Sequence, residues 1–125
     1  MRMDPRTDKV VLRHDAFEKT PLQENEELLL LGQCLDRVKK HGRGAKLDLK
    51  EGGELMDKVL KTPAISDFDD SHLWFNGNVE RLREHGFRKL ASAHPRAIIQ
   101  CPVDFLAPLI LGIPQKAKEI LDMFG

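Results

Sequence analysis

Ala45-Lys46-Leu47-Asp48-Leu49-Lys50 is the stretch that decides the predicted fold. We interpret it as a short strand that brings an acidic residue, with a lysine close by, to its C-terminal end. The run Val10-Val11-Leu12-Arg13-His14-Asp15 has the same character, with a histidine and an aspartate at its end. In α/β proteins with parallel sheets, ligands and catalytic residues gather at this end of the strands. The alternative is that both are ordinary strand ends whose charges are solvated.

Strand and helix patterns alternate along the rest of the chain. The predicted strands span residues 10–12, 45–50, 73–75 and 97–100, and the predicted helices span 26–40, 55–60, 79–86, 103–109 and a last stretch from Pro114. This order implies right-handed βαβ crossovers and a parallel sheet. Four such units make half of an eight-stranded barrel, which typically needs about 250 residues. We therefore predict a single α/β domain over residues 1–125 that resembles a partial TIM-type (β/α) barrel, with a small open α/β domain as the alternative.

The composition is that of an ordinary globular chain with room for one core. Among its 125 residues, 20 Lys and Arg balance 20 Asp and Glu, so no basic excess points to nucleic acid as a partner. The longest apolar run, 28–31, is too short for a membrane span. Residues 1–5 lack the apolar region of a secretory signal. Cys34 and Cys101 have no zinc spacing, and we expect a buried, reduced Cys34 in a cytoplasmic protein.

Two motifs resemble those of a known superfamily. Val11-Leu12-Arg13-His14-Asp15 resembles the strand-end His-Asp motif of the glycerophosphodiester phosphodiesterase-like barrels. Lys46-Leu47-Asp48-Leu49-Lys50 resembles their acid-x-Lys strand, which usually reads Glu-x-Lys. With Trp74-Phe75-Asn76-Gly77-Asn78 and Pro102-Val103-Asp104, the chain is closer still to the menorin-like branch of that superfamily. The resemblance covers roughly residues 10–109.

The resemblance implies a metal-dependent hydrolase that acts on a small phosphodiester of the glycerophosphodiester type. Asp15 and Asp48 would bind a divalent cation, Mg²⁺ or Ca²⁺, through oxygen ligands. His14 would protonate the leaving alkoxide as a general acid, and Lys50 would offset the charge that develops on the phosphoryl group.

The polar residues that end the third and fourth predicted strands are further candidates. Asn76 and Gln100 would line the mouth of a pocket and bind substrate. The alternative for Asn76 is a simple Asn-Gly turn with Gly77. Trp74 is expected in the core. The acidic cluster Asp67, Asp69 and Asp70 lacks the spacing of a calcium loop and is expected to be a solvated loop.

The chain also departs from the superfamily pattern. A His-Arg pair and acidic ligands belong on two strands upstream of the His-Asp strand, but only nine residues precede Val10, and the chain ends before the last strands of the barrel. The second hypothesis is therefore a non-catalytic or truncated barrel relative that serves as a binding or interaction domain. Open sheet edges of a partial barrel need cover, so we also expect a homo-oligomer.

Overall fold

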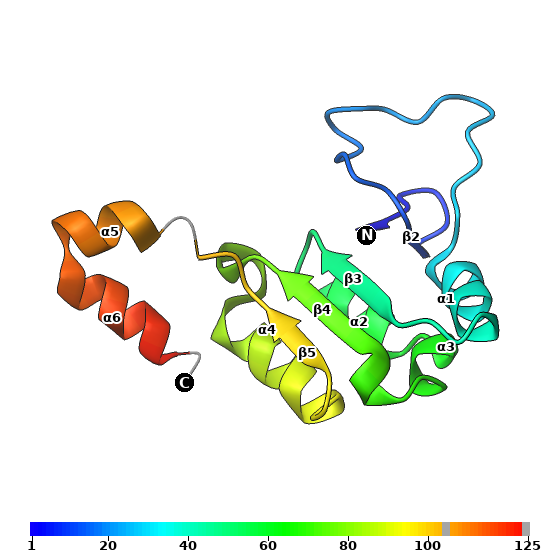
Figure 1. Ribbon diagram of the computed structural model, residues 1–125. Helices are drawn as coiled ribbons and strands as arrows, with labels where there is room; N and C mark the ends of the chain where they lie inside the picture. Colours follow the sequence, from blue (N-terminus) through cyan, green and yellow to red (C-terminus); the bar gives the residue numbers. More distant parts are fainter. Residues whose placement is uncertain (104–105, 124–125) are drawn as a thin grey trace.

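The main sheet of the molecule has three parallel strands. The computed structural model describes residues 1–103 and 106–123 (Figure 1). Strands β3 (Ala45–Leu49), β4 (Leu73–Gly77) and β5 (Ile98–Gln100) lie side by side in that order and are parallel. The prediction of a parallel α/β unit is therefore confirmed for these strands. No closed barrel forms among the described residues.

Helices cover one face of this sheet. Helices α2 (Glu54–Leu60) and α3 (Pro63–Ser66), with the short 3₁₀ helix η1 (Asp70–His72), connect β3 to β4, and α4 (Val79–Ala93) connects β4 to β5. In Figure 1, α2 and α4 lie behind the strands. Because side chains alternate between the two faces of a strand, every second residue is buried against these helices. The buried strand residues are Ala45, Leu47, Leu49, Leu73 and Phe75.

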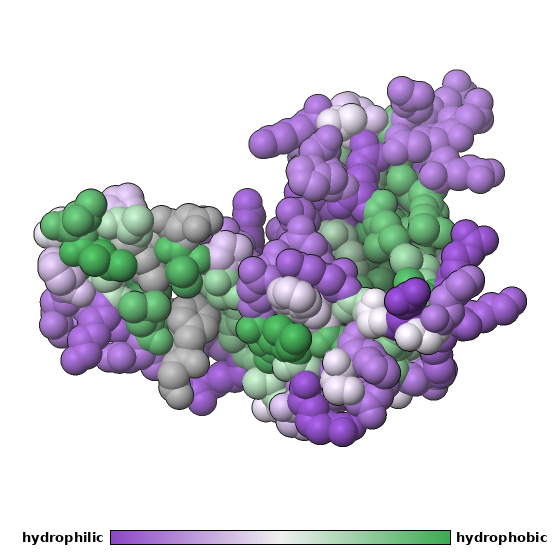
Figure 2. Space-filling model, viewed as in Figure 1, coloured by the Kyte–Doolittle hydropathy of each residue, from purple (hydrophilic) through white to green (hydrophobic). Residues whose placement is uncertain are grey.

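No helix covers the opposite face of the sheet in Figure 1. The register places Lys46, Trp74 and Ile98 in one row across it, and Asp48, Asn76 and Gln100 in the next row toward the carboxyl edge. Trp74 is 38% exposed, so the prediction that it belongs to the core is wrong. Figure 2 shows polar and apolar residues mixed on this face.

The first predicted strand does not join the parallel sheet. Strand β2 (Val10–Val11) instead pairs antiparallel with β1 (Arg2–Met3) in a separate small sheet. The buried carboxylate of Asp4 closes the turn between them, because it accepts hydrogen bonds from the backbone N–H of Arg6 (3.0 Å) and the Thr7 hydroxyl (2.9 Å). The prediction that four adjacent parallel strands end at Asp15, Asp48, Asn76 and Gln100 is therefore wrong for the first of them.

Long-range pairing also shortens the first helix. Helix α1 spans Leu31–Lys40, five residues shorter at its N-terminus than the predicted 26–40. Leu30 is extended and forms a bridge with Val11, and the Leu12 amide donates to the Leu29 carbonyl at 2.9 Å. The predicted stop is confirmed, since Gly42 follows the helix with a φ of +62°.

Gly86 lies inside α4 rather than at its end, so the prediction that this helix stops there is wrong. A side chain at this position would place a Cβ 3.0 Å from the Leu82 Cβ and 3.5 Å from the Met56 sulfur. Glycine therefore allows α4 and α2 to approach closely.

A helical hairpin follows the sheet. It consists of α5 (Leu106–Gly112) and α6 (Pro114–Asp122), with Pro114 in the first turn as predicted. Exposed apolar side chains on it include Ile110, Leu111 and Ile113, and Figure 2 shows apolar surface over this hairpin. Asp104 and Phe124 lie outside the described residues. None of the described helices is both long and apolar enough to cross a membrane.

Candidate ligand-binding site at the carboxyl edge of the sheet

Asp48 is the centre of a polar set on the open face of the sheet. It lies directly opposite Asn76 in the register of β3 and β4. The Asn76 side-chain amide donates to Asp48 Oδ1 at 2.9 Å, and Lys50 Nζ lies 2.7 Å from Asp48 Oδ2. Partial burial raises the pKa of Asp48, but the hydrogen bonds from Lys50 and Asn76 outweigh it, so this pKa lies below its usual value. Asp48 is therefore held ionised, with both carboxylate oxygens engaged.

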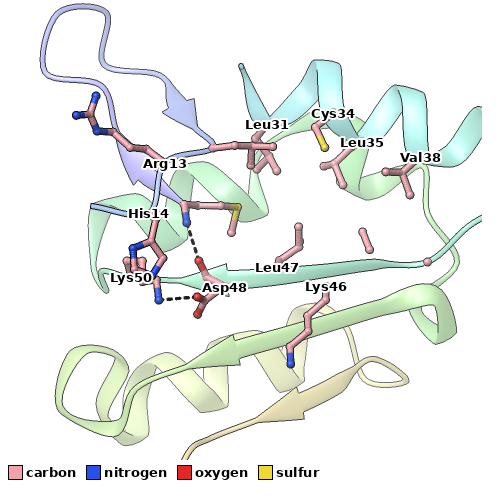
Figure 3. A pocket seen from close by; sticks show the side chains of 14 residues that line it. Arg13, His14, Leu31, Cys34, Leu35, Val38, Lys46, Leu47, Asp48 and Lys50 are labelled. Atoms are coloured by element: carbon pink, nitrogen blue, oxygen red, sulfur yellow. Dashed lines mark hydrogen bonds and ion pairs between the residues drawn. The ribbon is translucent and has the colours of Figure 1, made fainter. Parts of the chain in front are cut away.

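A groove of about 450 Å³ runs along the outer side of β3 and ends at this polar set (Figure 3). Its polar lining contains one acid, Asp48, and four basic side chains: Arg13, His14, Lys46 and Lys50. Its apolar lining comes mainly from α1, through Leu31, Cys34, Leu35 and Val38. The groove thus has an apolar wall and an excess of basic groups.

His14 reaches the groove from the loop after β2. Its Nδ1 lies 2.8 Å from the Asp15 carboxylate, and both side chains are largely exposed. This hydrogen bond lowers the pKa of Asp15. The guanidinium of Arg2 holds the loop, because it donates to the His14 carbonyl at 3.2 Å and to Glu51 at 3.0 Å. Asp15 itself does not line the groove.

Two further cations contribute to the lining. Arg13 pairs with Glu26 at 2.7 Å and lies over the ring of Phe17, 4.6 Å from its centroid. Lys46 Nζ lies 4.3 Å from the centroid of the Trp74 ring, a cation–π contact on the open face. Lys46 precedes Asp48 by two residues, so both side chains leave the same face of β3.

Asn76 also lines a second, smaller cavity of about 250 Å³. The other polar residues around it are Asp48, Lys50, Asn78 and Arg81. The Asn78 side chain caps α4 by accepting from the Glu80 amide at 2.7 Å. The Asn76 Oδ1 atom is buried without a hydrogen-bond partner. A buried acceptor of this kind is costly unless it is satisfied, so it is suited to a ligand hydroxyl or amine.

The predicted site residues come together only in part. His14, Asp48 and Lys50 line one groove, and Asn76 joins Asp48 and Lys50 at the second cavity. Asp15 lines neither cavity, and nor does Gln100, which is exposed beside Asn76. Asn76 and Gly77 belong to β4, so the alternative of a simple turn is wrong.

The residues of this site do not fit a divalent cation. Within the described residues, no three His, Cys, Asp or Glu side chains lie close enough together to hold a metal ion. A hard cation needs several oxygen ligands. Asp48 is the one acid of the groove, and its carboxylate is already bound by Lys50 and Asn76. The divalent cation stays a prediction from the resemblance.

Sequence reasoning missed several residues of the site. Arg13 and Lys46 belong to the two motifs. Arg13 is adjacent to His14, and Lys46 lies two residues before Asp48, so these positions could have indicated that both belong to the site. Arg81 and Asn78 could be found only from the packing of α4 against the sheet. His94 was given no role, but it is 8% exposed, lies 2.9 Å from the Asp70 carboxylate and packs against the Phe75 ring. This pair supports the core and not the site.

Asp67 and Asp69 are exposed in a loop, as predicted, whereas Asp70 begins the 3₁₀ helix η1. Asp69 accepts from the amide and hydroxyl of Ser71 and thereby caps η1. These hydrogen bonds lower the pKa of Asp69 to about 2.

The chain was compared with protein-family models, curated proteins and solved structures, and nothing matches it.

Proposed function

We propose that this chain is a phosphodiesterase-like barrel relative that binds a small phosphodiester, of the glycerophosphodiester type, in the groove beside β3. One observation carries the proposal: four basic side chains and a single acid, Asp48, line the groove, so basic groups outnumber acidic groups in its lining. The parallel order of β3, β4 and β5, with helices on one face, supports the proposal, because a segment of a (β/α) barrel would have this arrangement.

Each basic residue would make a different contact with one phosphate group. Lys50 supplies a compact positive charge beside the carboxyl end of β3. His14 uses Nδ1 for Asp15, which leaves Nε2 as the ring atom for a phosphate oxygen.

Calorimetric titration with glycerophosphocholine tests this proposal. Lys50→Gln should weaken binding about 10-fold or more, because a hydrogen bond to a charged group contributes about 1.5–3 kcal/mol. Lys19→Gln is the matched control, since Lys19 is exposed and lines neither cavity of the site. Equal affinities of the two variants, or no saturable binding by the unaltered chain, would overturn the proposal.

Hydrolysis of the same ligand, with His14 as the general acid, is the second candidate. The observation that favours it is that His14 and Lys50 line one groove with Asp48. In this reading His14 protonates the leaving alkoxide, and His14→Ala should lower the rate of hydrolysis of bis(p-nitrophenyl) phosphate about 10²–10⁴-fold. The assay is run with Mg²⁺ or Ca²⁺ and repeated with EDTA. Turnover at background in every condition rejects hydrolysis and leaves the binding proposal to its own test.

A homo-oligomer and a cytoplasmic location also stay proposals. The open face and edges of the sheet are the surfaces that self-association would cover. Light scattering at micromolar concentration tests it, and a stable monodisperse monomer would reject it.

A further inference from the structure

The outer edge of β3 has no strand partner in the part of the chain that the structure describes. Sheet order places β3 at one side of the three strands, with β4 on its inner side only. Five consecutive residues, 44–48, line the groove described above. Because their side chains alternate between two faces, a single groove touches all five only when it lies against the edge of the strand.

The backbone at this edge offers unused hydrogen-bonding groups. The amino group of Met1 donates to the Asp48 carbonyl at 2.7 Å, which places that carbonyl at the outer edge. Backbone groups of successive strand residues point to opposite edges, so the N–H and C=O of Lys46 face the same side as those of Asp48. Across residues 1–103 and 106–123, no backbone group pairs with Lys46 from that side. Such groups are suited to another extended backbone.

The walls of the groove define which side chains this backbone would carry. Figure 3 shows the apolar side chains of α1 directed toward the gap above β3. Leu31 and Leu35 are buried, whereas Cys34 and Val38 are half-buried and form the accessible part of this wall. The basic side chains of the lining are Arg13, His14 and Lys46. Arg13 pairs with Glu26, His14 pairs with Asp15, and Lys46 lies over the Trp74 ring on the open face of the sheet. An occupant therefore needs apolar side chains toward α1 and acidic side chains toward Lys46 on the open face.

We propose that the outer edge of β3 and the groove beside it dock an extended peptide segment of alternating apolar and acidic residues, which adds a fourth strand to the sheet. Backbone hydrogen bonds to Lys46 supply one part of the affinity, and the alternating side chains supply specificity. The two proposals share one groove, but this one rests on the apolar wall and the strand edge, so the peptide probes test it separately from the phosphodiester.

A synthetic peptide, acetyl-Val-Glu-Val-Glu-Val-amide, is the probe. It should bind the full chain saturably, with NMR shift changes at the amides of residues 44–48. Two matched peptides test the mechanism: one with N-methyl groups on alternate residues, which cannot pair as a strand, and one with Lys in place of Glu. Each should bind at least 10-fold more weakly. Equal binding of the N-methylated peptide, or no saturable binding of the probe, would overturn the proposal.

Variants of the chain complete the test. Lys46→Glu reverses an exposed charge at the edge and should weaken binding of the probe 10-fold or more, while it improves binding of the lysine peptide. Val38→Glu should also weaken binding. The control is Ile113→Glu, because Ile113 is exposed and caps the N-terminus of α6; this change should leave binding of the probe unchanged. Unchanged affinity in Lys46→Glu would overturn the proposal, as would a stable dimer that buries the β3 edge and excludes the peptide.

Discussion

The two faces of the three-stranded sheet are built from alternate residues of the same strands but differ in what they do. On the covered face, Leu47 and Phe75 are 5% and 0% exposed and pack against helices. On the open face, their neighbours Lys46 and Trp74 are exposed, and Asp48 is half-buried in a polar set. The side chains that point to the covered face therefore stabilise the fold, and the alternate side chains on the open face are available to contact a ligand.

The largest expected effect is the loss of a covered-face aromatic. Phe75→Ala should lower the free energy of unfolding by about 3–5 kcal/mol, because it leaves a cavity in the core. Trp74→Ala, one residue away on the open face, should cost about 1 kcal/mol, since it removes mainly partial burial and a cation–π contact. Urea unfolding measures both. Similar losses in the two variants would break the division between the faces.

His94 should rank next, because it supports the covered face through two contacts. Its Nδ1 lies 2.9 Å from Asp70, and its ring centroid lies 5.3 Å from that of Phe75. His94→Ala leaves the partner carboxylate without this hydrogen bond and should cost about 1–3 kcal/mol in urea unfolding. His41→Ala is the control, because His41 lies exposed at the end of α1. An equal, small effect of both changes would show that His94 is dispensable to the core.

A smaller effect on stability is expected when the pH is lowered, because Asp48 on the open face becomes protonated. The pKa of Asp48 is lower in the folded chain than in the unfolded chain, so ionised Asp48 stabilises the fold above the unfolded pKa of about 3.9. This contribution is lost as the pH falls below about 4 and through the folded pKa. Asp48→Asn should therefore flatten the fall in stability over this range, measured by urea unfolding at stepped pH.

Exposed Asp36 provides the control for this experiment. Asp36→Asn should leave the slope of stability against pH unchanged. If Asp48→Asn loses stability with falling pH as steeply as the unaltered chain does, Lys50 and Asn76 do not stabilise the ionised form of Asp48.

Local patterns in the sequence predicted the parallel unit, because apolar runs, turn residues and helix ends define β3, β4 and β5 within short windows. They did not predict that residues 10–11 pair antiparallel with β1 in a separate sheet. That segment is set by the buried Asp4 turn and by pairing with Leu29 and Leu30, which are tertiary interactions. The same long-range arrangement leaves Asp15 outside the groove.

Strand ends predicted which of the candidate residues lie together, whereas the contacts that depend on strand register were missed. Asp48, Lys50 and His14 stand at the ends of recognisable runs and line one groove. The contact between Asn76 and Asp48 needs the pairing of β3 with β4, and the place of Arg81 needs the packing of α4. Neither follows from spacing along the chain.

An NMR titration with glycerophosphocholine tests the central claim most directly, because it reports which face and which edge of the sheet meet the ligand. The account predicts saturable amide shift changes at Arg13, His14 and residues 46–50, with little change along the buried sides of α2 and α4. Lys50→Gln should move the midpoint of this titration to a ligand concentration about 10-fold higher or more. Saturable changes confined to other parts of the chain, or none at millimolar ligand, would contradict the account.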